Sequence, residues 1–220
     1  MSEEIVAERA WQERAVSRSL ERSRAHAERR SARFIETARE LVEETGGEDF
    51  TVQDVVDRMK VSTRTFYQFF AGKDEFLLAM FEEGQRERNH RLRKVVDAEP
   101  DPLARLRAFV IGSQQGTQRS ASSRFMVQHY FRLLASHPAE LRQSYKGVVA
   151  YLAGLIADAA ASGDVRSTDH RRTAGFILQA MNTAVQANIL DSPLMDPPPS
   201  PEEVWEFCLR GLGAGPVNAE

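Results

Sequence analysis

Two short amphipathic segments separated by a tight turn occupy residues 51–73. The first segment has apolar residues at the spacing of one helical face, namely Val52, Val55, Val56 and Met59. Thr51 is placed to cap this helix, and Asp54, three residues later, approximates a capping box. Ser62 can cap the second helix, whose inner face consists of Phe66, Phe69 and Phe70. The pattern predicts a helix-turn-helix.

Helices predicted on both sides supply the walls that two short helices need in order to bury their apolar faces. Residues 31–45 are amphipathic, with an inner face of Phe34, Ile35, Ala38, Leu41 and Val42. A further helix begins near Asp74, with an inner face of Phe76, Leu77, Met80 and Phe81. Its continuation, residues 85–96, is rich in arginine, and we expect it to be an exposed connector with a solvated face.

The pattern beyond residue 101 is helical, with start signals at Pro102, Pro138 and Ser200-Pro201. No segment alternates apolar and polar residues as a strand does, so the chain is predicted to be all-α. We expect an N-terminal three-helix helix-turn-helix domain followed by a larger helical domain. The expected units are an extension at 1–28, a helix-turn-helix domain at 29–81 with a connecting helix to about residue 97, a second domain at 98–213 and a tail at 214–220.

Composition adds a few exclusions. The chain has 220 residues, of which 42% are hydrophobic and 28% charged, as in ordinary globular proteins. No apolar run approaches the ~18 residues of a membrane span, and the Glu- and Arg-rich N-terminus is unlike a secretory signal. Cys208 is the only cysteine, which excludes an intrachain disulfide and a cysteine-based metal site. A cytoplasmic location without membrane association is therefore expected.

The distribution of charge says more than the net charge of −3. From Arg58 to Lys73 there are four cations and no acid. The outer side of the second helix carries groups that reach phosphates and base edges: Thr63, Arg64, Thr65, Tyr67 and Gln68. Arg64 is suited to guanine and Gln68 to adenine. The alternative is that these side chains only solvate the helix.

Two other classes of function, an enzyme and a protein-interaction module, fit the sequence less well than DNA binding. An enzyme would need a nucleophile with its base, a metal site or a phosphate-binding loop. The five histidines, at positions 26, 90, 129, 137 and 170, include no i, i+4 pair, and no Gly-rich phosphate loop is present. We therefore expect neither enzyme activity nor a cofactor. A pure protein-interaction module would not need an acid-free second helix that carries hydroxyls and Arg64.

Residues 31–81 resemble the DNA-binding domain of the tetracycline-repressor (TetR) family of transcriptional regulators. The ordered set that carries the resemblance is Thr51, Val61-Ser62, Phe66-Tyr67, Phe69-Phe70 and Lys73-Asp74-Glu75-Phe76-Leu77. Two positions depart from the family pattern. Lys60 stands where a turn glycine is usual, and Phe69 stands where tyrosine or histidine is common. A non-glycine residue in a left-handed turn costs on the order of 1 kcal/mol.

The resemblance implies roles for individual residues of this motif. Thr51, Tyr67 and Lys73 are expected to contact phosphates, whereas Phe66 and the phenylalanines after it belong to the core. With the cap and the outer face of the second helix, the expected DNA-binding residues are Thr51, Ser62, Thr63, Arg64, Thr65, Tyr67, Gln68 and Lys73.

The second domain is expected to bind a small molecule and to dimerise. In the family, helices of this region enclose a ligand pocket, for which the candidates here are Phe109, Phe125, Met126, His129, Tyr130, Tyr145, Tyr151 and Leu155. Each of them alone is better explained as part of the core. The set favours a pocket because His129, Tyr130 and Tyr145 place polar atoms on apolar faces. Few charges fall on these faces, which favours an apolar or aromatic effector.

The last two helices are apolar on more than one face, and the resemblance implies that they pair with their twins in a C2 dimer. The expected interface residues are Phe176, Ala180, Met181, Ala184, Ala187, Val204, Phe207 and Cys208. The N-terminal extension is either a solvated segment or a basic arm that reaches an adjacent groove. Together these expectations describe a homodimeric repressor that binds a pseudo-palindromic operator in double-stranded DNA and is released by the effector.

Overall fold

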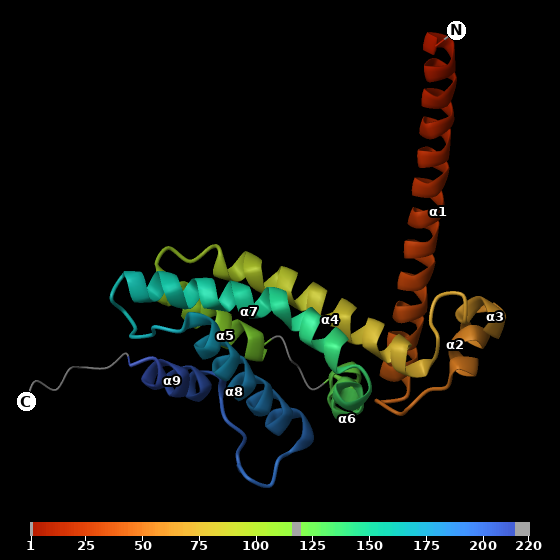
Figure 1. Ribbon diagram of the computed structural model, residues 1–220. Coiled ribbons are helices and arrows are strands. Elements are labelled where there is room, and N and C mark those ends of the chain that lie inside the picture. The colour runs from red at the N-terminus through yellow and green to blue at the C-terminus, as the bar shows by residue number, and fades with distance from the viewer. Residues whose placement is uncertain (1, 116–119, 214–220) are drawn as a thin grey trace, which may run out of the picture.

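The computed structural model describes residues 2–115 and 120–213, with side chains from residue 11 onward, and these ranges contain helices and no strand (Figure 1). The helices are α1 (Ser2–Glu44), α2 (Val52–Met59), α3 (Thr63–Phe66), α4 (Lys73–Val96), α5 (Pro102–Gln115), α6 (Ala121–Ser136), α7 (Pro138–Ala161), α8 (His170–Leu190) and α9 (Pro201–Gly211). The predicted all-α class is confirmed. The expected tail at 214–220 lies outside the described residues.

Helix α1 joins two segments that the sequence pattern treats separately. It runs without a break from the expected extension into the amphipathic helix predicted from residue 31. Its N-terminal part projects away from the rest of the molecule (Figure 1), whereas Phe34, Ala38 and Val42 in the C-terminal part are fully buried. The helix is followed by Gly46 and Gly47, whose φ angles of +72° and +100° belong to the left-handed region that favours glycine.

The helix-turn-helix has the predicted caps. The Thr51 hydroxyl accepts the Asp54 N–H at 3.2 Å, and the Asp54 carboxylate accepts the Thr51 N–H at 2.7 Å. Lys60 ends α2 in the left-handed conformation (φ 54°, ψ 46°), at the position where a glycine is usual. Ser62 caps α3 by accepting the Thr65 N–H at 3.2 Å. Helix α3 proper ends at Phe66, and residues 67–69 form a turn, so the regular helix is shorter than the phenylalanine spacing predicts.

An aromatic core holds the three N-terminal helices against the start of α4. Phe66 lies near the centre of this core, with ring centroids 5.6 Å from Phe34 and 5.2 Å from Phe76. Helix α6 packs into the same core, because Phe125 stacks on Phe50 at 5.5 Å with an interplanar angle of 26°. Helix α6 therefore follows the expected domain boundary at residue 98 in the chain but packs with the residues before it.

A second core lies among the C-terminal half of α4 and helices α5, α7, α8 and α9, with Leu106, Phe109, Leu152, Ile156, Ala174 and Trp205 among its buried members. Helix α4 runs through both cores and links them (Figure 1). Helices α8 and α9 lie far from α2 and α3. None of the described helices combines the length and the apolar character needed to cross a membrane.

Candidate nucleic-acid interface and effector cavity

The exposed side of α3 carries most of the predicted DNA-contacting side chains. Thr63, Arg64, Tyr67 and Gln68 are exposed, and Tyr67 retains 58% of its accessible surface. Thr65 is half-buried, with its hydroxyl 3.0 Å from that of the Ser62 cap. An exposed phenol beside a guanidinium, an amide and a hydroxyl is a set of donors that fits a groove and its phosphates.

Three of the predicted DNA-binding residues have side chains that already have partners within the domain. The Thr51 and Ser62 hydroxyls serve as helix caps. The Lys73 ammonium donates to Asp49 Oδ1 at 2.6 Å and to the Phe50 carbonyl, and it lies 5.0 Å from the centre of the Phe50 ring. Lys73 thus ties the start of α4 to the loop before α2, and its contact with phosphate stays a prediction.

Arg58 is also paired, because its guanidinium donates two hydrogen bonds to the Glu44 carboxylate, one of them at 2.9 Å. Of the four cations between Arg58 and Lys73, only Lys60 and Arg64 lack a carboxylate partner among the described residues. One copy of the helix-turn-helix therefore offers DNA few free positive charges.

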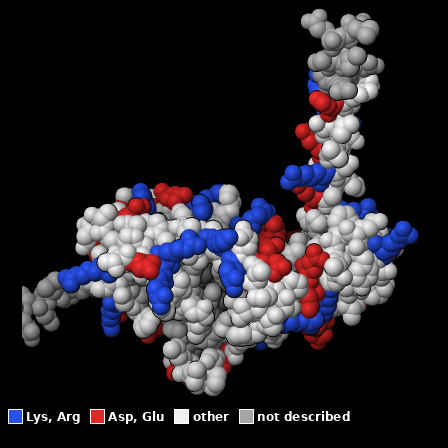
Figure 2. Space-filling model, in the orientation of Figure 1, with Lys and Arg blue, Asp and Glu red and all other residues white. Residues whose placement is uncertain are grey.

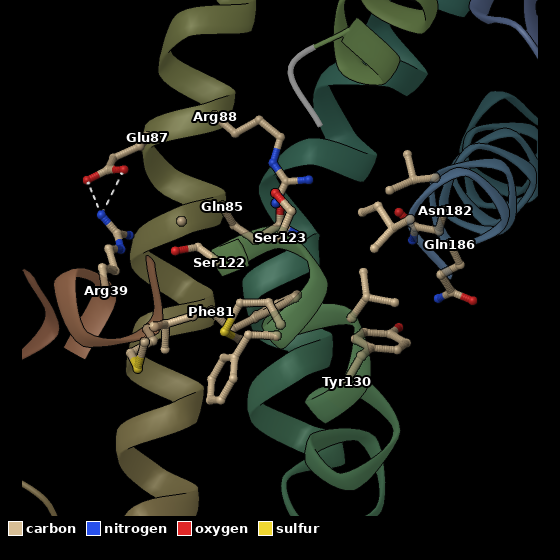
Figure 3. Close-up of a pocket in the computed structure, with 18 of the residues that line it drawn as sticks. Arg39, Phe81, Gln85, Glu87, Arg88, Ser122, Ser123, Tyr130, Asn182 and Gln186 are labelled. Atoms are coloured by element: carbon tan, nitrogen blue, oxygen red, sulfur yellow. Dashed lines mark hydrogen bonds and ion pairs between the residues drawn. The ribbon is translucent and has the colours of Figure 1, made fainter. Parts of the chain in front are cut away.

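A cavity of about 240 Å³ lies between α1, α4, α6, α7 and α8 (Figure 3). Four of the predicted pocket residues line it: Phe125, Met126, Tyr130 and Tyr145. The cavity contacts α1 through Arg39 and Val42, so its wall includes the helix that supports the helix-turn-helix. On the face drawn in Figure 2, basic side chains gather around a hollow near the middle of the molecule.

The other four predicted pocket residues do not line this cavity, and the prediction is corrected for them. Phe109 and Tyr151 border a separate hollow of about 110 Å³, where the Tyr151 hydroxyl donates to Asp97 at 2.8 Å. Burial, and then the bond to Asp97, raises the pKa of Tyr151 to about 12. Leu155 is buried in the second core. His129 lies instead against the helix-turn-helix domain, 3.6 Å from Asp49.

Charged residues of α4 were missed as pocket residues, because the polar segment 85–96 was expected to be a solvated connector. Glu87 and Arg88 line the cavity, and Glu87 accepts two hydrogen bonds from Arg39 at 3.0 and 3.1 Å. Burial is the largest cause that lowers the pKa of Arg88. The signal was available in the spacing, since the apolar stripe of α4 continues through position 88: Leu77, Phe81, Gly84, Arg88 and Leu92.

Aromatic side chains form one wall of the cavity. The Phe81 ring lies 6.0 Å from Tyr130 and 5.9 Å from Tyr145, measured between centroids. Burial raises the pKa of Tyr145, the charge and hydroxyl of Tyr130 raise it further, and Arg88 and Asn182 act in the opposite direction. The Tyr145 hydroxyl is therefore protonated at neutral pH, with Tyr130 and Asn182 beside it.

Contacts between α6 and the N-terminal core connect the cavity wall to the helix-turn-helix. Ser122 lines the cavity, and its N–H donates to the Glu43 carboxylate of α1 at 2.9 Å. Bonds from Ser122 hold the pKa of Glu43 below its usual value. Farther along α6, Arg132 pairs with Asp74 of α4 at 2.6 Å. A change in the cavity that moves α6 would therefore act directly on the ends of α1 and α4.

The predicted dimer residues divide into two groups. Phe176 and Phe207 are exposed, with 65% and 71% of their surface accessible, and Ala180 is half-buried. The other five face the core of their own chain, which corrects the interface prediction for Met181, Ala184, Ala187, Val204 and Cys208. Burial raises the pKa of the Cys208 thiol to about 11, in keeping with its expected role as a small apolar side chain.

Residues 34–80 match the family model described as bacterial regulatory proteins, tetR family. Similar solved structures include a TetR-family regulator from Pectobacterium atrosepticum, with a TM-score of 0.67 and 19% identity over 86% of this chain and 93% of that one. FadR of Bacillus halodurans, a fatty acid degradation regulator, has a TM-score of 0.64 and 16% identity over 86% and 97%. FadR of Bacillus subtilis, in complex with stearoyl-CoA, has a TM-score of 0.60 and 19% identity over 82% and 96%.

A comparison with curated proteins found no match. The likeness to the solved structures, all below 25% identity, establishes the fold across most of the chain. The family model identifies the helix-turn-helix region, since it covers α2, α3, the C-terminal end of α1 and the first turns of α4. Residues 34–80 therefore form a DNA-binding domain of the tetR type, and most of the chain shares the fold of solved regulators that include members of the TetR family.

Proposed function

We propose that this regulator is a homodimeric repressor that binds a pseudo-palindromic operator and is released when a small molecule with an apolar or aromatic body enters the cavity. The observation that carries the proposal is the position of the cavity. Its wall includes α1 and α6, which hold the helix-turn-helix, together with α8, which belongs to the second core. We propose that residues 29–81 bind DNA and that residues 98–213 bind the effector and dimerise. Helix α4, which extends to about residue 97, connects these two parts.

DNA reading is assigned to the exposed side of α3. Arg64 and Gln68 would contact base edges, while Thr63, Thr65 and Tyr67 would contact bases or phosphates. Thr51, Ser62 and Lys73 remain proposed contacts through atoms that their internal bonds leave free, including the backbone N–H groups at the starts of α2, α3 and α4. Because the protein would act on DNA inside the cell, we propose a cytoplasmic location.

The dimer is supported by the small number of free cations on one copy. Lys60 and Arg64 alone would release few counterions, and affinity for DNA depends strongly on that number. Two linked copies double the contacts and turn the second binding event into an intramolecular one. The exposed Phe176 and Phe207 on α8 and α9 mark the surface through which we propose the copies pair.

The apolar body of the effector is supported by the cavity wall, where Phe81, Met126 and Tyr130 present aromatic and thioether surfaces. One structural neighbour, FadR of Bacillus subtilis, holds stearoyl-CoA. We propose that this chain also responds to a ligand, which shifts α6 against α1 and so changes the distance between the α3 helices of the two copies.

Selection of bound sites from random DNA, followed by gel shift with the selected site, tests the proposal. We expect an inverted repeat whose half-sites lie about one helical turn, ~34–36 Å, apart. Adding apolar and aromatic small molecules to the complex should release the DNA with at least one of them. Recovery of a single half-site would contradict the dimer, and a complex that no compound releases would contradict the effector role of the cavity.

A further inference from the structure

We propose that the effector carries one carboxylate and that the guanidinium of Arg88 binds it inside the cavity. The inference rests on the proposed function, because it takes the cavity to be the effector site. It adds the chemical class of the ligand, an amphipathic monocarboxylate, and the residue that selects it.

The charges that line the cavity do not balance. Three arginines, Arg39, Arg88 and Arg91, face a single carboxylate, that of Glu87. Arg39 donates to both oxygens of Glu87, at 3.0 and 3.1 Å, so this pair neutralises itself. Arg91 is exposed to solvent. The excess positive charge within the cavity therefore belongs to Arg88.

Arg88 has no ion pair or hydrogen bond with any of the residues that the structure describes. Its guanidinium extends from α4 toward the space beside α7 and α8 (Figure 3). Burial disfavours its charged form, which is the reason its pKa is lowered. A desolvated cation without a counterion destabilises the fold, and an anion that enters the cavity would remove that cost.

Other donors near Arg88 suit the same anion. The Tyr145 hydroxyl is close enough to Arg88 for the two groups to influence each other's pKa, and it stays protonated at neutral pH. The Asn182 amide, on α8, lines the same cavity. A carboxylate has acceptor sites for a bidentate arginine and for further donors at once. The apolar remainder of the ligand would lie against Phe81 and Met126.

The size of the cavity limits the apolar body. A volume of about 240 Å³ is below the usual range of small-molecule sites, so it suits one aromatic ring or a chain of moderate length. Suitable probes are octanoate and 4-ethylbenzoate, with octanamide and 4-ethylbenzamide as neutral partners of nearly the same shape. The preference for an acid over its amide isolates the contribution of the charge.

Calorimetric titration of the full chain with these four probes tests the inference, using Arg88→Met and a control, Arg86→Gln. Arg86 lies on the same helix, is exposed, and pairs with Glu83 outside the cavity. We expect each acid to bind the unsubstituted protein and the control about tenfold or more tightly than its amide, as a charge-assisted bond implies. Arg88→Met should remove that preference and still bind the amides.

The melting temperature without ligand gives a second readout. Arg88→Met should raise it, because the variant replaces a partly buried cation that has no ion pair with any described residue by an apolar side chain, while Arg86→Gln should not. An unchanged preference for acids in Arg88→Met, or amides that bind the unsubstituted protein as tightly as acids, would overturn the carboxylate assignment and leave the cavity as the effector site. Failure of all four probes to bind would overturn it as well, and if no compound released the operator the proposed function would fail with it.

Discussion

Lys60 shows how one residue can keep a strained conformation at the centre of a functional motif. It holds φ 54° and ψ 46° at the end of α2, and its N–H donates to the Asp57 carbonyl at 3.1 Å. The left-handed region is unfavourable for a residue with a Cβ, and a turn of the chain into α3 requires it here. As one of the two cations of the motif without a carboxylate partner in the described chain, Lys60 offers DNA a charge that glycine would not.

The first prediction concerns this strain. Lys60→Gly should raise the free energy of unfolding by about 0.5–1 kcal/mol, because glycine adopts positive φ at little cost. Urea denaturation measures the change. Lys60→Ala is the matched control, since it removes the same side chain but keeps the Cβ, and we expect it to give no such gain. Equal stabilities for the glycine and alanine variants would mean that the turn is not strained.

The second prediction concerns the reading of DNA. Arg64 is exposed and, among the described residues, has no carboxylate partner, so its guanidinium is available to a base edge. Arg64→Ala should weaken binding to the selected operator by about 1–3 kcal/mol and relax specificity at one base pair. Arg142→Ala, which removes an exposed arginine from α7, is the control for charge and should bind as before. Operator affinity unchanged in Arg64→Ala would contradict the assignment, and it can be measured by fluorescence anisotropy.

At the scale of elements, α6 is the joint between the two parts of the molecule. Phe125 stacks on Phe50, Arg132 pairs with Asp74, and His129 lies 3.6 Å from Asp49. Burial lowers the pKa of His129 from 6.5, outweighing the opposite effect of Asp49, while Lys73 and Arg132 lower it and Asp74 raises it. The neutral imidazole is therefore the form that fits between α6 and the helix-turn-helix domain.

The third prediction follows from this lowered pKa. The imidazole of His129 is harder to protonate in the folded chain than in the unfolded chain. As the pH falls, protons therefore bind the unfolded chain preferentially. The free energy of unfolding should keep its full value above about pH 6.5 and decrease below it. Carboxylates with lowered pKa values, such as Glu43, stabilise the fold throughout this range and lose that contribution only at lower pH. Between pH 6.5 and 5 the unsubstituted protein should therefore lose more unfolding free energy than His129→Gln. Parallel urea titrations at several pH values would reveal the difference, and identical slopes would exclude His129 as the cause.

The sequence predicted the starts of α2, α3 and α9 because each start has a local cause. Thr51 with Asp54, and Ser200 with Glu203, form the capping boxes at α2 and α9. Burial on a given side depends on distant partners and was predicted less well. An aromatic residue that lines a cavity has the same helical spacing as one that fills a core, so the pattern did not separate Tyr145 from Phe109.

The same limit explains the two larger corrections. Helices α8 and α9 are apolar on more than one face, and the pattern does not say which face meets the chain's own core and which meets a partner. The polar neighbours of Arg88 in the chain predict a solvated side chain, although its position continues the apolar stripe of α4. Only the approach of α6, α7 and α8 turns that position inward.

At the scale of the whole molecule, α2 and α3 lie far from α8 and α9 (Figure 1). The cavity contacts both ends of this arrangement, because its wall includes α1, which supports the helix-turn-helix, and α8. An exposed phenylalanine on each of α8 and α9 is unusual for a surface that stays in water, and two of them on neighbouring helices suggest a covered patch. In a twofold dimer the same patch would be used by both copies, which fixes the distance between the two α3 helices. The fit to two successive major grooves would then depend on this patch, although it lies far from α3.

The fourth prediction tests this dependence with Phe176→Glu and Phe207→Glu. A glutamate in the patch would place two like charges, one from each copy, in an apolar interface, and its desolvation opposes association. Both variants should sediment as monomers at micromolar concentration and lose affinity for the inverted repeat while keeping their melting cooperativity. Phe131→Glu is the matched control, since Phe131 is 63% exposed but lies on α6, outside the patch. If the control also became monomeric, or if both patch variants stayed dimeric, the copies would pair through another surface. In that case α8 and α9 would not set the distance between the two α3 helices.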